Sequence, residues 1–124
     1  MGKKIAMLLS IIFIGVILLR IDFPMEESDV IGSYVNKNYS NEPCCVEAPH
    51  IIDTLVLMAD KTFKSDFYGN GKYKISYENS FTTRIEWEYE MGGAGYNTYF
   101  SNELFEMPKI ILNYDMNHYY EKLK

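Results

Sequence analysis

The chain has 124 residues with 12 basic and 17 acidic side chains, which leaves room for one small domain. Residues 1–20 hold three basic side chains and no acidic one, so residues 21–124 carry 9 basic and 17 acidic side chains, a net charge of −8. This charge excludes a basic nucleic-acid-binding surface and disfavours docking onto anionic lipid. The 11 Tyr, 7 Phe and one Trp exclude a disordered chain.

An apolar run over residues 5–19 opens the chain, preceded by Lys3 and Lys4 and closed by Arg20. This is the layout of a secretory signal. At 1.5 Å per residue the run spans about 22 Å, short of the ~30 Å of bilayer hydrocarbon, and including Ile21 brings it closer. No cleavage site of small residues follows. Residues 1–21 are therefore predicted to be either a cleaved signal peptide or an uncleaved transmembrane helix that attaches the chain to the membrane through residues 5–21. Both alternatives place the rest of the chain in the cell envelope, on the extracytoplasmic side.

Residues 22–29 are acidic and predict a short linker, so the folded domain is expected over residues 30–124. Short segments of β-forming residues follow one another through this domain. They cover residues 30–39, 52–58, 62–68, 72–77, 83–90, 96–102, 109–114 and 118–123. Strands of this length joined by tight turns predict an all-β fold, an antiparallel up-and-down meander that closes into a small barrel or a strongly curled sheet after an N-terminal hydrophobic helix.

The pairing of the central strands is predicted from their alternation. The Gly69-Asn70-Gly71 sequence indicates a hairpin, and a three-residue loop with a bulge places Phe67 opposite Tyr73. In the next hairpin, Tyr73 is expected opposite Tyr89, because this register also sets lysines opposite glutamates on the outer face.

Three glutamates, Glu86, Glu88 and Glu90, alternate along one strand. Such a row resembles the carboxylate set of a calcium site. Their lysine neighbours instead predict a solvated strand face. A solvated row also lacks the contrasting environments that catalytic carboxylates need.

Four aromatic residues, Tyr73, Tyr77, Trp87 and Tyr89, share one predicted face, which we expect to be the barrel interior. Inward tyrosine hydroxyls can line a semi-polar ligand pocket. They can equally be satisfied within a packed core. These four residues are the candidate ligand-binding set.

Cys44 and Cys45 are the two cysteines of the chain. A bond between them would join adjacent residues in a strained ring, and an intermolecular disulfide is the other oxidised form. A redox or soft-metal site would add Glu47 and His50, but the spacing is not that of known zinc sites. No metal or cofactor is predicted, and His50 and His118 are expected at the surface.

A family resemblance extends over roughly residues 30–90. Val-Ile-Gly-Ser-Tyr at 30–34, Asp-Thr-Leu-Val-Leu at 53–57, Asp-Lys-Thr-Phe at 60–63 and Gly-Lys-Tyr at 71–73 together resemble the opening of bacterial lipocalin-like domains. Tyr34 stands where lipocalins usually have Trp, and the domain is shorter than a full lipocalin. The resemblance carries no catalytic motif and implies a binding or structural module, often outside the cytoplasm.

These observations predict a protein without enzymatic activity, because no catalytic constellation is found. The leading hypothesis is a lipocalin-like module that binds a small apolar or amphipathic ligand inside the barrel. The alternative is an envelope protein of the inhibitor or immunity type, whose acidic surface meets a cationic protein. The third is a redox or metal-dependent role for the Cys44-Cys45 segment.

Overall fold

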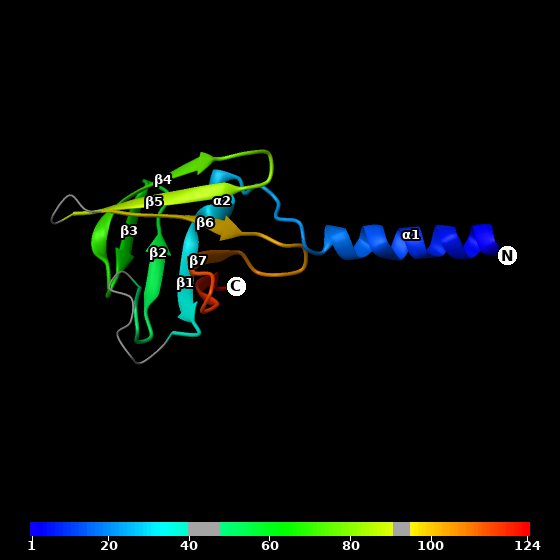
Figure 1. Cartoon of the computed structure of the whole chain (residues 1–124). Coiled ribbons are helices and arrows are strands. Elements are labelled where there is room, and N and C mark those ends of the chain that lie inside the picture. Colours follow the sequence, from blue (N-terminus) through cyan, green and yellow to red (C-terminus); the bar gives the residue numbers. More distant parts are fainter. Residues whose placement is uncertain (40–47, 91–94) are drawn as a thin grey trace.

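The structure is a computed structural model that describes residues 1–39, 48–90 and 95–124. Within these residues there are two helices and eight strands (Figure 1). In chain order they are α1 (Gly2–Leu18), α2 (Glu27–Val30), β1 (Gly32–Lys37), β2 (Thr54–Leu57), β3 (Thr62–Ser65), β4 (Gly69–Tyr77), β5 (Thr83–Tyr89), β6 (Gly95–Ser101), β7 (Lys109–Asn113) and β8 (His118–Lys122).

The eight described strands form a closed barrel in which each strand pairs with the next along the chain and β8 pairs with β1. All of these pairings are antiparallel, so the predicted up-and-down barrel with an N-terminal helix is confirmed. The sequence favours this fold because inward and outward side chains alternate, most clearly along β5, where Thr83, Ile85 and Trp87 are buried and Glu86 and Glu88 are exposed.

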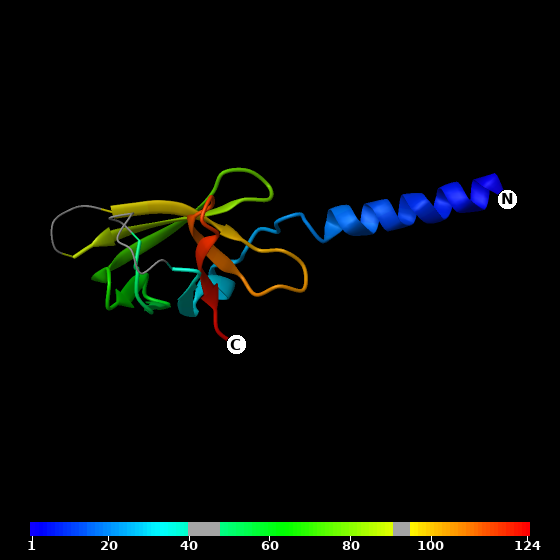
Figure 2. The ribbon, with the colours of Figure 1, turned by 60° about the horizontal axis from the view of Figure 1, so that its bottom comes forward.

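The alternating strand directions give the barrel two ends. The end that we call the α1 end carries residues 22–31, 58–61, 78–82 and 102–108. The opposite end, which we call the mouth, carries residues 48–53, 66–68 and 114–117 among those described. Helix α1 projects away from the barrel in both views, and none of its residues is buried (Figures 1 and 2). None of the described helices combines the length and the apolar character needed to cross a membrane.

The α1 end of the barrel is plugged by the chain that precedes β1. Met25 and Val30 are buried there, and the Tyr34 hydroxyl donates a hydrogen bond of 2.6 Å to the Val30 carbonyl oxygen. The backbone N–H of Met25 donates to Thr83 Oγ1 at 2.9 Å. The stretch expected to be a linker, residues 22–29, is thus bonded to the barrel and contains most of α2.

The β3–β4 hairpin differs from its prediction. The three-residue loop is Asp66-Phe67-Tyr68, and the Gly69–Gly71 segment belongs to β4, where Gly71 pairs with Phe63. The turn lies earlier because the buried Asp53 carboxylate accepts hydrogen bonds from the N–H groups of Asp66 and Phe67 at 3.0 and 3.2 Å. This contact comes from outside the hairpin, so local turn signals do not contain it.

The β4–β5 register is displaced by two residues from the prediction, and Tyr73 pairs with Trp87 instead of Tyr89. A displacement of two residues keeps every side chain on its predicted face. Lysines still face glutamates, since Lys72 pairs with Glu88 and Lys74 with Glu86. Both glutamates are exposed, which agrees with the predicted solvated face.

Candidate functional site at the mouth of the barrel

An aromatic column fills the mouth half of the barrel. At its base the Trp87 and Tyr96 rings are stacked, with centroids 5.1 Å apart and planes 17° apart. The Tyr68 ring meets Trp87 edge-on at 5.2 Å and lies nearly parallel to Tyr89 at 5.7 Å. Offset and edge-to-face geometries at these distances are favourable pairs, each worth about 1 kcal/mol beyond area burial. The four rings therefore form one continuous cluster of stacked and edge-on contacts.

The column continues to the rim of the mouth. The Phe67 ring lies edge-on to Tyr68 at 4.8 Å, and the His50 ring lies edge-on to Phe67 at 6.3 Å. Phe67 and His50 are half-buried, whereas Trp87 is fully buried. The β1–β2 connection, the β3–β4 turn and the β5–β6 pair bring these rings together from distant parts of the sequence. The result is a series of contacting rings that become less buried toward the rim.

Two side-chain nitrogens are buried in the barrel, one of them in the column. Among the described residues, Trp87 Nε1 and His118 Nε2 have no hydrogen-bond partner although both atoms are buried. A buried polar group without a partner costs about 1–3 kcal/mol. The expectation that His118 is at the surface is wrong, since it is 5 % exposed and shares the inward-facing set of β8 with Tyr120. Burial lowers the pKa of His118, so its imidazole favours the neutral form.

A buried carboxylate, Asp53, joins three parts of the barrel beside the mouth. Its Oδ2 accepts hydrogen bonds from Ser65 Oγ at 2.7 Å and from the Tyr120 hydroxyl at 2.5 Å. Its backbone N–H donates to Asn36 Oδ1 at 2.7 Å. Together with the two N–H groups of the β3–β4 turn, four donors surround this one carboxylate. Asp53 therefore ties β1, β3 and β8 to the start of β2.

The Asp53–Tyr120 pair has a structural role at neutral pH. Burial raises the pKa of Tyr120, and the neighbouring Asp53 carboxylate raises it further. The hydroxyl consequently stays protonated and remains a donor. The Asp53–Tyr120 hydrogen bond therefore persists near neutral pH and attaches β8 to the start of β2.

The four tyrosine and tryptophan candidates occupy different places. Trp87 and Tyr89 belong to the aromatic column. Tyr73 is buried, but its hydroxyl donates to the Met58 carbonyl oxygen at 2.6 Å toward the α1 end. Tyr77 does not line the interior as expected, because it is 51 % exposed and its hydroxyl donates to the Met25 carbonyl oxygen. Tyr77 is the last residue of β4 and so lies at the α1 end, where the N-terminal segment supplies its hydrogen-bond partner.

Several residues of the site were not found from the sequence. Tyr68 was expected within a regular strand. Tyr96 was expected at the start of a strand, and no feature of the sequence around it indicated a role in the site. The signal for Asp53 is a lone acidic residue directly before a buried apolar strand, at the start of the Asp-Thr-Leu-Val-Leu segment. Such a residue is buried only when partners exist for its charge.

Cys44 and Cys45 lie outside the described residues, as does Glu47, so the disulfide, redox and soft-metal hypotheses stay predictions. Within residues 1–39, 48–90 and 95–124, no group of three or more His, Cys, Asp or Glu side chains could hold a metal ion.

A hollow of about 440 Å³ lies on the outer wall of β3, β4 and β5. Exposed charged side chains, among them Lys64, Lys72 and Glu88, border it. A second hollow of about 310 Å³ shares Lys72 and Glu88 with the first. Tyr89, a member of the aromatic column, also borders the larger hollow.

No protein-family model, curated protein or solved structure matches this chain. The site is therefore interpreted from its own geometry.

Proposed function

We propose that this protein is an exported or membrane-attached, lipocalin-like binding module without enzymatic activity, and that the mouth of its barrel takes the apolar part of a small amphipathic ligand. The pair of buried nitrogens without partners, Trp87 Nε1 and His118 Nε2, carries this proposal. Ring faces supply apolar contact, and a polar ligand group would satisfy a nitrogen that is otherwise orphaned.

The direction of ligand entry follows from the packing. Met25, Val30 and Tyr34 are buried and plug the α1 end. The rings at the mouth instead become progressively less buried toward the rim, from Trp87 to Phe67. A ligand therefore enters from the mouth and places its apolar end against the column.

The membrane part of the proposal rests on α1. After Lys3 and Lys4 its side chains are apolar except for Ser10, and none is buried against the barrel. Large apolar side chains that no protein surface covers favour transfer into hydrocarbon. We therefore infer that α1 enters a membrane, as a signal segment during export or as a lasting attachment.

The outer wall gives less support to the acidic-surface alternative. On the β4–β5 face, positive and negative side chains alternate across the strands, with Lys72 opposite Glu88 and Lys74 opposite Glu86. A surface of mixed sign steers a cationic protein less strongly than a surface of one sign.

The test uses Trp87, the single tryptophan, as an internal reporter. Decanoic acid is titrated into the full chain while Trp87 emission is followed. We expect a saturable change, because the ligand contacts the column around this ring. Tyr89→Ala removes one half-buried ring of the column and is expected to weaken binding about fivefold, the equivalent of one aromatic contact.

The matched control is Tyr119→Ala. Tyr119 is also half-buried, but its ring lies 4.8 Å from Lys109 Nζ, away from the column. Tyr119→Ala should leave the decanoic acid titration unchanged. Trp87 emission that does not respond to decanoic acid, or that responds equally in both variants, would overturn the mouth as the binding site.

A further inference from the structure

The α1 end of the barrel exposes large apolar side chains to water. Four of them, Phe23, Phe81, Leu104 and Phe105, come from three separate segments, and we call this set the apolar rim. Phe81 is 55 % exposed and Phe105 is 89 % exposed. Single exposed apolar residues are ordinary, but several at one end of a small domain mark an interaction surface.

Hydrogen bonds bring the three segments of the apolar rim side by side. The Phe23 N–H donates to the Asn102 carbonyl oxygen at 2.9 Å, and Asn102 Nδ2 donates to the Phe23 carbonyl oxygen at 3.1 Å. Phe23 is thereby fixed beside the β6–β7 connection that carries Leu104 and Phe105. Two residues later, Met25 bonds to both ends of the β4–β5 turn, which carries Phe81. Figures 1 and 2 show these two connections on either side of the chain that leads out to α1.

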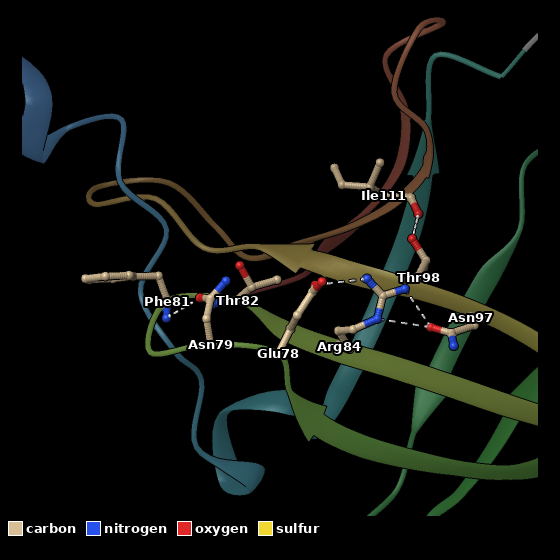
Figure 3. A network of polar contacts seen from close by, with 8 residues as sticks. All are labelled: Glu78, Asn79, Phe81, Thr82, Arg84, Asn97, Thr98 and Ile111. Carbon is tan, nitrogen blue, oxygen red and sulfur yellow. Dashed lines mark hydrogen bonds and ion pairs between the residues drawn. The ribbon is translucent and has the colours of Figure 1, made fainter.

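The turn that carries Phe81 is held rigidly. Asn79 Oδ1 accepts hydrogen bonds from the N–H groups of Phe81 and Thr82 at 2.8 and 2.9 Å. Behind the turn, the Arg84 guanidinium bonds to Glu78 at 3.3 Å and to Asn97 at 2.8 Å. Figure 3 shows the Phe81 ring pointing away from the strands that this network joins. The ring is thus presented outward by a fixed backbone and does not fold back onto the barrel.

Phe105 has an unfavourable backbone as well as an exposed ring. Its φ is +66°, in the left-handed region that a bulky residue rarely adopts. A polar residue such as Asn would tolerate this conformation better and would also suit water. Exposure of the Phe105 ring to water is unfavourable, whereas burial of the ring in an apolar environment would be favourable.

We propose that the apolar rim inserts into the surface of a zwitterionic lipid bilayer, beside the point where α1 enters it. This proposal rests on the membrane attachment of α1 proposed above. The short connection from Leu18 to Phe23 holds the rim close to the helix, so both would meet the same membrane. Acidic side chains around the rim, including Glu26 and Glu103, repel anionic lipid and suit the ammonium groups of zwitterionic headgroups.

The experiment measures the depth of spin labels on the full chain in phosphatidylcholine vesicles. The background carries Cys44→Ser and Cys45→Ser, so that each label has one attachment point. Labels are placed on Ser80→Cys beside Phe81, on Asp115→Cys at the mouth, and on Ile12→Cys within α1. Depth is read from the ratio of collisions with oxygen to collisions with a water-soluble nickel chelate. We expect this ratio to be several-fold higher at position 80 than at position 115.

Two double variants sharpen the result. Phe81→Ser with Phe105→Asn should lower the ratio at position 80 to the value at position 115. The matched pair at the mouth, Ile52→Ser with Tyr114→Ser, also removes two exposed apolar side chains and should leave the ratio unchanged. Neither pair removes a buried contact, so both variants keep the fold.

The label in α1 separates two kinds of failure. If position 12 is shielded from nickel while position 80 is as accessible as position 115, α1 enters the bilayer and the apolar rim does not. If position 12 is also accessible to nickel, the membrane attachment itself is wrong and the rim proposal is overturned with it. A high ratio at position 80 that both double variants lower equally would also overturn the rim, because the effect would not depend on these residues.

Discussion

Asp53 is the residue on which the barrel interior depends most. It is 3 % exposed, and its carboxylate accepts hydrogen bonds from two side chains and two backbone N–H groups. A buried charge is tolerated when donors surround it in this way. The same four bonds set the position of the β3–β4 turn and attach β8 through Tyr120. One side chain therefore links the start of β2 to three other parts of the barrel.

We predict that Asp53→Asn lowers the free energy of unfolding by about 3 kcal/mol, because the amide presents a donor where the carboxylate meets only donors. Tyr120→Phe removes one of the four bonds and should cost about 1–2 kcal/mol. Urea unfolding followed by circular dichroism measures both values. Equal losses in the two variants would contradict the central role given to the carboxylate.

The buried histidine predicts a pH dependence of stability. Burial lowers the pKa of His118 below its ordinary value of 6.5, so near and below this pH the unfolded chain binds more protons than the folded chain. Stability should therefore be complete above pH 6.5 and fall as the pH decreases below it. Unfolding at pH 7.5 and 5.5 measures this, and the part of the decrease due to His118 should disappear in His118→Gln.

The control for the histidine is His50→Gln, which changes the half-buried histidine at the rim. It should retain the decrease in stability between the two pH values. A decrease that persists in full in His118→Gln would assign the pH dependence to other groups.

At the level of elements, β4 is the strand whose glycines decide the shape of the barrel. A Cβ on Gly71 would lie 2.0 Å from the Glu88 carbonyl oxygen and 2.7 Å from Phe63 Cε1. The missing side chain thus lets β3, β4 and β5 approach closely where the barrel curls. Gly69 differs, since its φ is +76° but no atom lies within 4 Å of its Cβ position. One glycine is needed for space and the other for backbone conformation.

We predict that Gly71→Ala destabilises the barrel by about 3 kcal/mol through steric overlap with β5 and Phe63. Gly69→Ala meets no such overlap and should cost about 1 kcal/mol for its left-handed backbone. The two variants introduce the same methyl group two residues apart. Their chemical unfolding therefore compares the cost of steric overlap with the cost of a left-handed backbone. The prediction fails if Gly69→Ala is the more damaging of the pair.

For the whole molecule, the barrel and α1 are structurally separate parts joined through residues 19–21. No residue of α1 is buried, whereas Met25 and Val30 contribute to the core. The boundary of the folded unit therefore lies near residue 22, several residues before the expected domain start at residue 30. The acidic stretch between them is part of the barrel because it supplies the plug of the α1 end.

Two truncations test this boundary. Removal of residues 1–19 should leave the free energy of unfolding unchanged to within about 0.5 kcal/mol, because no buried contact is lost. Removal of residues 1–30 deletes the buried Met25 and Val30 and should cost about 4 kcal/mol. Both are measured by urea unfolding in the same mild detergent as the full chain. Equal stability of the two truncations would show that the plug contributes nothing.

The sequence by itself determined the antiparallel up-and-down order of the strands and the apolar N-terminal helix, whereas closure into a barrel came from the pairing of β8 with β1. Alternation with a period of two places each side chain on one face, and a displacement of two residues preserves that face. This is why Trp87 was correctly placed inside and Glu86 outside although the β4–β5 register was wrong. The alternation alone does not distinguish registers that differ by two residues.

Only the tertiary structure decided the position of the β3–β4 turn, the burial of His118 and the hydrogen bond of Tyr77 to the N-terminal segment. Each depends on a partner distant in sequence: Asp53 for the turn, the closed barrel wall for the histidine, and Met25 for the tyrosine. The aromatic column likewise takes its rings from separate strands and loops. Local patterns carry propensity and alternation, whereas a long-range contact exists only after the barrel has closed and has brought its two partners together.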